Sequence, residues 1–262
     1  MVLGGIALFV CGRITYAQDN KPTASTKPFD TRDLSGTWMG LRFGGNIILD
    51  GQQGGPGQKP AAPAGPGQGP PLPMTAWAQA KFDAYQKLGD DRYKMDPRRD
   101  CFPLGMPRDM YEPVPLEILQ SPDQVVILLE NDHINRHIFL NMTEHPKDLS
   151  PTWMGHSIGH WEGDTLVVDT VALHGETFLD GAGHPHTGQL HLIERIKRVD
   201  ANTLDDTVTV DDPGAYTKQF SIQKTYQLKP GWHVMEYVCE DEWSDKLKKY
   251  YPDGYFNGDG AK

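Results

Sequence analysis

The chain has 262 residues, a formal net charge of -10 at pH 7 and 38% hydrophobic residues. This length allows one large β domain or two small ones, and we predict a single domain. The acidic balance disfavours nucleic-acid binding, because surfaces that bind nucleic acid concentrate lysine and arginine.

Residues 1–17 resemble a secretory signal segment. A short apolar run at 6–10 is followed by small residues ending at Ala17, the pattern of a cleavage site. The run is too short to span a bilayer. We therefore predict a periplasmic or extracellular protein whose mature chain, 18–262, has lost Cys11.

The two remaining cysteines, Cys101 and Cys239, form an even pair suited to an oxidising compartment. A disulfide between them would close a long loop and contribute ~4 kcal/mol in the chain-entropy treatment. Two separate buried thiols are the alternative.

Residues 44–73 are dominated by Gly, Pro, Gln and Ala, which predicts a flexible loop. The next stretch, "MTAWAQAKFDAYQKLGDD", has apolar residues at helical spacing, with Thr75 as the N-cap and Gly89 at the end. Residues 97–115 are crowded with proline, which predicts extended and turn conformations.

Beyond Leu116, short β-rich runs alternate with turn residues. Short connections favour antiparallel pairing of neighbours, and a strand from the N-terminal Trp motif makes the sheet long enough to close. The predicted fold is mostly β, an antiparallel meander closing into a lipocalin-like barrel with one N-terminal helix. The expected strands are "QVVILLEN", "NRHIFLN", "HSIGHW", "TLVVDTVAL", "LHLIERIKRV", "LDDTVTVD", "QFSIQKTYQL" and "HVMEYVCE".

Two stretches nearly repeat each other, "DLSGTWMG" at 33–40 and "DLSPTWMG" at 148–155. The first resembles the Gly-x-Trp signature with which lipocalin-type barrels begin, where the Trp plugs the barrel base. The residues that follow the two copies diverge, which argues against a duplicated domain. We interpret Trp38 and Trp153 as packing residues at the ends of the sheet, with ligand stacking as the alternative.

A wider resemblance covers "PTWMGHSIGHWEGDTLVVDT", "TFLDGAGHPHTGQLHLIER" and "VDDPGAYTK". These runs resemble a family of secreted, largely uncharacterised proteins of acidobacteria and soil proteobacteria, with the patterns "WEGDTLVV", "WLDxxGHPHSExLxxxER" and "DDPxxYTKPW". This chain departs from the family at Phe178, Thr187 and the pair Gln219-Phe220. The resemblance implies no established reaction.

The segment "GHPHTGQLHLIER" is dense in histidine. His184 and His186 share a face if the backbone is extended, and Pro185 stiffens that geometry. With His191 or Glu194 as a third ligand, the set would suit a divalent metal such as Zn, Fe, Mn or Cu. A metal-free acid–base or binding site and a solvated turn are the alternatives.

Glu194 falls on the apolar face of its predicted strand, where a buried carboxylate needs a cation or is tuned for proton transfer. Arg136 is inward by the same alternation and is the natural partner. The two could form a structural pair, or Glu194 or Asp180 could be an acid or base beside the histidines, with Arg136 as an anion clamp.

The sequence thus favours a small-molecule enzyme with its site at the barrel mouth, performing acid–base or metal-assisted hydrolysis or elimination. The alternative is a non-catalytic barrel that binds an apolar or carbohydrate ligand. The pattern leaves the oligomeric state open. The predicted catalytic residues are Glu194, Asp180, His184 and His186; Arg136, His133 and Trp161 are predicted to bind substrate.

Overall fold

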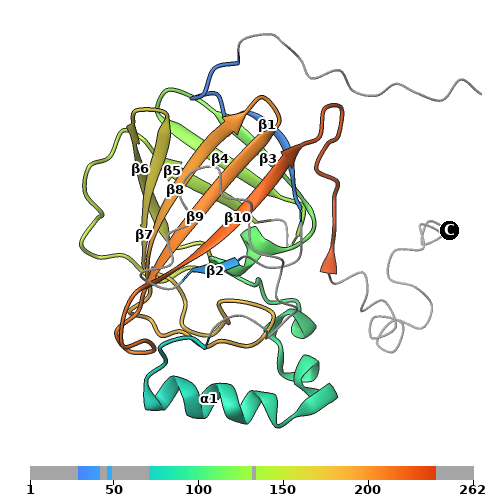
Figure 1. Cartoon of the computed structure of the whole chain (residues 1–262), viewed down its shortest axis with the longest axis vertical. Coiled ribbons are helices and arrows are strands. Elements are labelled where there is room, and N and C mark those ends of the chain that lie inside the picture. The colour runs from blue at the N-terminus through green and yellow to red at the C-terminus, as the bar shows by residue number, and fades with distance from the viewer. Residues whose placement is uncertain (1–28, 42–45, 49–70, 132–133, 240–262) are drawn as a thin grey trace, which may run out of the picture.

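The computed structural model describes residues 29–41, 46–48, 71–131 and 134–239. The signal-like segment, residues 49–70 of the Gly/Pro-rich stretch, and His133 lie outside the described residues. Figure 1 shows a β-barrel with a helix, α1, lying across one end. The predicted barrel class is confirmed.

Nine strands form the barrel wall in the described part of the chain, and it closes because β1 pairs with both β3 and β10. A short strand, β2 (Asn46–Ile48), pairs with β10 beside the wall and interrupts the stretch predicted as loop. The wall strands are β1 (Gly36–Gly40), β3 (Pro115–Gln120), β4 (Gln124–Leu129), β5 (Asn135–Phe139), β6 (His156–Glu162), β7 (Thr165–Val171), β8 (His191–Asp200), β9 (Thr203–Asp211) and β10 (Phe220–Leu228).

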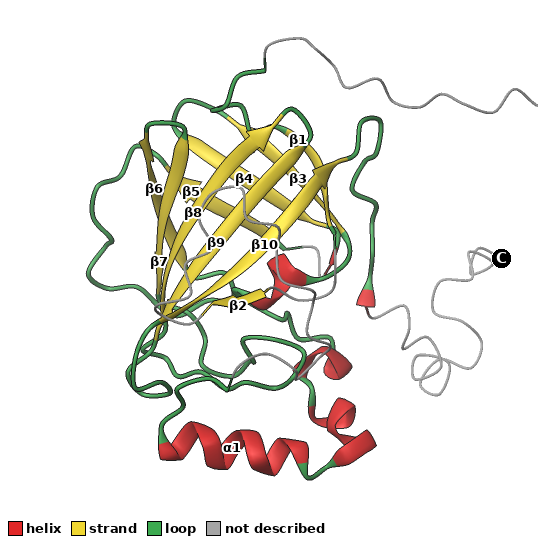
Figure 2. Cartoon of the chain, viewed as in Figure 1, coloured by secondary structure: helices red, strands yellow, loops and turns green. Residues whose placement is uncertain are grey.

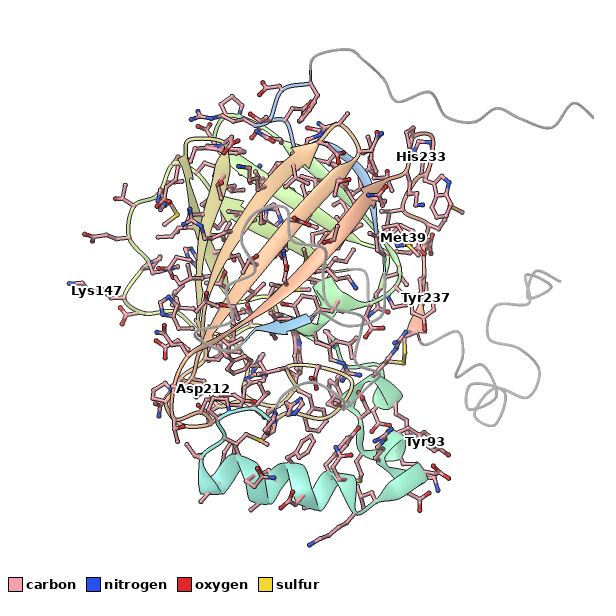
Figure 3. The ribbon with its side chains drawn as sticks, viewed as in Figure 1. Met39, Tyr93, Lys147, Asp212, His233 and Tyr237 are labelled. Carbon is pink, nitrogen blue, oxygen red and sulfur yellow. A yellow bond between two sulfur atoms is a disulfide. The ribbon has the colours of Figure 1, made fainter. Side chains whose placement is uncertain are left out.

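One pair in the wall departs from the predicted meander. β5 and β6 are parallel, with Ile138 opposite Ser157 and Phe139 opposite Ile158. The connection between them, residues 140–155, is long enough to run along the outside of the barrel, so β6 starts at the same end as β5. Figure 3 shows Lys147 on this outward crossover.

Two other strand predictions need correction. β3 was missed because its first residue, Pro115, ends a proline-crowded stretch. The expected strand "HVMEYVCE" is not formed in its described part, residues 233–239. β10 already pairs with β9 on one side and with β1 and β2 on the other, so it offers no edge to a further strand.

The predicted helix is confirmed as α1 (Ala76–Gln86), and the Thr75 hydroxyl caps it by accepting from the Ala78 N–H. The proline-crowded stretch contains 3-10 turns as well as extended segments. Figure 2 shows the helical segments near the α1 end. The three 3-10 segments are η1 (Gly89–Met95), η2 (Pro97–Asp100) and η3 (Arg108–Tyr111).

The two Trp motifs differ in structure. Trp38 is fully buried in the barrel core and donates from Nε1 to the Leu34 carbonyl at 2.9 Å, as the packing interpretation predicts. Gly36 of that copy has φ +132, a conformation closed to Pro151 at the matching position. The second copy is accordingly a loop, in which Trp153 is half-buried and packs against the rings of Phe102 and His174.

Cys101 and Cys239 form the predicted disulfide, with their Cα atoms 5.6 Å apart. The bond ties the segment that follows β10 to the residue after η2. No helix in the described part of the chain is long and apolar enough to cross a membrane.

Candidate functional site

The predicted site residues separate into three groups. Glu194 and Arg136 lie inside the barrel, His184 and His186 lie in the loop between β7 and β8, and His191 lies on the outer face of β8. In the described residues, no hydrogen bond or ion pair connects His184 or His186 with Glu194. The expectation of one converging set is therefore wrong.

The interior group is an ion pair that spans the inner face from β5 to β8. Arg136 and Glu194 are both fully buried, and Arg136 donates from Nη1 to Glu194 Oε1 at 2.8 Å and from Nη2 to Oε2. Nη2 also lies 3.3 Å from Ser157 Oγ and 3.1 Å from Thr170 Oγ1. The predicted inward pairing is confirmed, and the Arg136 guanidinium binds the Glu194 carboxylate through two parallel hydrogen bonds.

A second interior carboxylate, Asp206 on β9, was not predicted as a site residue. It is 1% exposed, and neither of its oxygens has a hydrogen-bond partner. Burial raises the pKa of Asp206 well above its usual value, and Glu194 adds to this. The signal was present in "LDDTVTVD", where alternation puts Asp206 on the same face as Leu204 and Val208.

Lys224 on β10 lies directly opposite Asp206 in the strand ladder and is also buried. Its Nζ donates to the Tyr111 carbonyl at 3.0 Å. Burial lowers the pKa of Lys224 to about 8, against the opposing effect of Glu112. The barrel interior is thus a mixed core in which charged groups are enclosed among apolar residues.

The histidine-rich loop uses His184 to pack against α1. The His184 ring stacks on Phe82 with centroids 4.5 Å apart, and its Nδ1 lies 2.6 Å from Asp180 Oδ2. Burial would raise the pKa of Asp180, but the bonds from His184 outweigh it and the pKa is lowered. Gly183 approaches Tyr85 so closely that a Cβ atom would lie 2.3 Å from its ring. These contacts dock α1 onto the loop.

His186 has separate partners. Its Nε2 lies 2.9 Å from Thr177 Oγ1 and its Nδ1 lies 3.2 Å from the Thr187 carbonyl. Burial lowers the pKa of His186. Asp180 Oδ1 accepts three backbone N–H groups in a turn that ends at His184. Pro185 follows in an isolated antiparallel bridge with Phe178, so the backbone there is extended as predicted, but the two rings have different partners.

His191 contacts neither of those rings, and its Nε2 lies 2.8 Å from Asp169 Oδ1. Within the described ranges, no three His, Cys, Asp or Glu side chains converge to hold a metal ion. Trp161, predicted to bind substrate, packs against the core with the Arg32 guanidinium 5.5 Å from its ring. The predicted ligands His184, His186 and His191 therefore do not share one site.

The outer face carries a hydrogen-bonded series that we name the histidine chain, made of His156, His145, Asp169 and His191. The Nδ1 atoms of His156 and His145 lie 2.8 Å apart, and His145 Nε2 lies 3.1 Å from Asp169 Oδ1. His191 joins the same oxygen from the other side. The four groups form a line rather than a shell around one point.

Strand order explains why these residues meet. His156 begins β6, Asp169 is near the end of β7 and His191 begins β8, so antiparallel pairing brings all three to one end of the barrel. Each alternates with an inward neighbour and faces outward. His145 reaches them from the crossover, and this long-range contact left no local pattern in the sequence.

A pocket of about 560 Å³ lies beside β5 and the last residues of the crossover. β5 and β6 pair over only two residue positions, and the pocket adjoins this short contact. His156 lines it, with the Phe139 ring stacked against the imidazole at 5.3 Å. The lining residues are Ile134, Asn135, His137, Phe139, Thr152, Trp153, Met154, Gly155 and His156.

Comparison with known proteins found no matching family model, no matching curated protein and no matching solved structure. The resemblance to a secreted bacterial family therefore stays a prediction. Function has to be inferred from the pocket and the histidine chain.

Proposed function

We propose that this chain is an exported protein that binds a small, largely apolar molecule in the pocket beside β5. The carrying observation is the pocket itself, about 560 Å³ and lined by Phe139, Trp153 and Met154. That volume is in the range of small-molecule sites, roughly 300–1,000 Å³. The disulfide and the signal-like N-terminus support an exported location.

The pocket offers flat aromatic surfaces together with a few polar groups. Trp153 also contacts the ring of His174 at 4.6 Å, which supports the indole from behind. Asn135 and His137 supply hydrogen-bonding groups on the β5 side. Such a lining suits a planar apolar molecule that carries one hydroxyl or carbonyl group.

The ion pair inside the barrel is less suited to bind a ligand. Glu194 is bonded at both oxygens to Arg136 and fully buried, which are the contacts of a structural ion pair. The acid–base roles predicted for Glu194 and Asp180, and the divalent metal, stay predictions.

The test uses small apolar probes, namely 2-naphthol, indole and cyclohexanol, titrated into isotope-labelled full-length protein. We expect at least 2-naphthol to shift the NMR signals of the pocket residues. Trp153→Ala should weaken its binding at least tenfold, because the largest aromatic surface of the lining is lost.

Trp77→Ala is the matched control, since Trp77 is a 45% exposed tryptophan on α1 that does not line the pocket. It should bind 2-naphthol as the wild type does. The proposal is overturned when none of the three probes shifts the pocket signals, or when Trp153→Ala binds 2-naphthol with unchanged affinity.

A further inference from the structure

We infer that the pocket is also catalytic, with His156 as a general base that activates water to hydrolyse a small apolar ester. This inference rests on the proposed binding function and adds a reaction to it. His145 and Asp169 are positioning residues, because they act on the reacting group through His156.

The hydrogen bonds determine which nitrogen of His156 is basic. The Asp169 carboxylate only accepts, so His145 donates to it from Nε2. A neutral His145 then has an accepting Nδ1, to which His156 donates from its own Nδ1. The lone pair of His156 is left on Nε2, and the residue lines the pocket. In the Ser-His-Asp triad an aspartate fixes the tautomer of the catalytic histidine directly. Here Asp169 acts on His156 through His145.

The composition of the lining points to water as the nucleophile. The nine lining residues include no serine or cysteine, and the Thr152 hydroxyl donates to the Gly155 carbonyl at 3.2 Å. Asn135 and His137 of the same pocket can donate hydrogen bonds to an oxygen that gains negative charge.

The reaction balances with water as the one co-reactant. His156 Nε2 takes a proton from water while the water oxygen bonds to the ester carbonyl carbon, giving a tetrahedral intermediate. The bond from that carbon to the leaving oxygen then breaks, and the imidazolium returns its proton to the leaving oxygen. The products are a carboxylic acid and an alcohol.

The surroundings of His156 favour its neutral, basic form. Burial lowers its pKa below 6.5, and His145 lowers it further. The titratable groups around it are His145 from the crossover, which bonds to it, and His137 from β5, which lines the same pocket. Asp169 from β7 lies one hydrogen bond further away and His191 from β8 two. The hydrolysis rate should therefore rise with pH through a midpoint below 6.5 and stay level above it.

The activity test uses full-length protein and 2-naphthyl acetate, whose product is the probe of the binding experiment. His156→Gln should lower kcat/KM about 100-fold, within the usual contribution of a general base. The variant should still bind 2-naphthol, which shows that it is folded. His160→Gln is the matched control, because His160 lies on the same strand and its side chain is 66% exposed.

A second measurement needs no substrate. Long-range ¹H–¹⁵N spectra of the imidazoles at pH 7.5 should show His156 protonated at Nδ1 and His145 at Nε2. Asp169→Asn should remove this tautomer preference, because an amide can donate as well as accept, and should lower kcat/KM about tenfold with a changed pH midpoint. A purely structural aspartate would leave the tautomers unchanged.

The outcomes separate the two proposals. Binding of 2-naphthol with equal hydrolysis by the wild type and His156→Gln overturns the catalytic inference and leaves the binding function standing. Absence of probe binding overturns both. His156 found protonated at Nε2 contradicts the inferred direction of the hydrogen bonds whatever the rates are.

Discussion

The Arg136–Glu194 pair, which joins β5 to β8, and the histidine chain both contact the two strands between them, β6 and β7, from opposite sides of the barrel wall. Ser157 and Thr170 point inward and contact the arginine, whereas the residues just before them, His156 and Asp169, belong to the outer chain. The alternation of side chains along a strand thus separates two polar clusters by a single residue.

The difference lies in what each cluster leaves open. Inside, both carboxylate oxygens of Glu194 are bonded to Arg136, and neither side chain is exposed. Outside, the Asp169 side chain is 39% exposed, and the line of bonds ends at His156 in the pocket wall. A buried ion pair such as the one inside changes the stability of the fold, in either direction. A hydrogen-bonded chain that ends in a pocket can instead exchange protons with a ligand.

The largest effect should come from breaking the interior pair. Glu194→Gln leaves the buried Arg136 without its counter-charge, and should lower the free energy of unfolding by about 3–5 kcal/mol. Urea denaturation measures this change. Binding of 2-naphthol by the remaining folded protein should be unaffected, since the lining of the pocket does not include Glu194.

The matched control is Glu162→Gln, the same substitution in the exposed pair that Glu162 makes with Arg195 on β8. Its urea midpoint should equal that of the wild type, since exposed ion pairs contribute little. Equal stability of the wild type and Glu194→Gln would show that the interior pair is not a structural unit.

Substitution of Asp206 should raise the free energy of unfolding, whereas Glu194→Gln lowers it. Asp206→Leu, nearly equal in shape, removes a buried carboxylate without partners and should stabilise the fold by about 1–3 kcal/mol. Folding raises the pKa of Asp206, so the native state binds the proton of this carboxyl more tightly than the unfolded state does. The free energy of unfolding of the wild type therefore falls as the pH rises above 3.8. The gain from the substitution should therefore increase with pH.

Urea midpoints of the wild type and Asp206→Leu, measured between about pH 4 and about pH 8, follow this trend. Asp205→Leu serves as the control, since Asp205 accepts from Thr225 Oγ1 at 2.6 Å and its loss should not stabilise. A gain at Asp206 that is the same at every pH would exclude the raised pKa as its cause.

The sequence predicted which side chains face the barrel interior where a strand alternates apolar and polar residues. The pattern of β5 and β8 placed Arg136 and Glu194 inside the barrel, and the contact between them followed. The same reasoning applied to β9 would have found Asp206. It failed for the site expected at His184 and His186, because Asp180 and Phe82 bind one ring and Thr177 binds the other, which alternation along the chain does not reveal.

The histidine chain could not be predicted from local sequence patterns, because it depends on a contact between distant segments. His145 lies in a loop, and it reaches His156 and Asp169 only because β5 and β6 are parallel and the crossover returns along the outer face. Short connections elsewhere predicted neighbouring antiparallel strands, whereas this parallel pair lies beside the pocket and His156.

The smallest change in stability should accompany Asp169→Asn. Because the Asp169 side chain is 39% exposed and its partners are histidines at the surface, the free energy of unfolding should change by less than about 1 kcal/mol. Urea denaturation of the full-length variant measures it. A loss as large as that of Glu194→Gln would mean that the outer chain stabilises the wall as the inner pair does, and the functional contrast between the two faces of β6 and β7 would disappear.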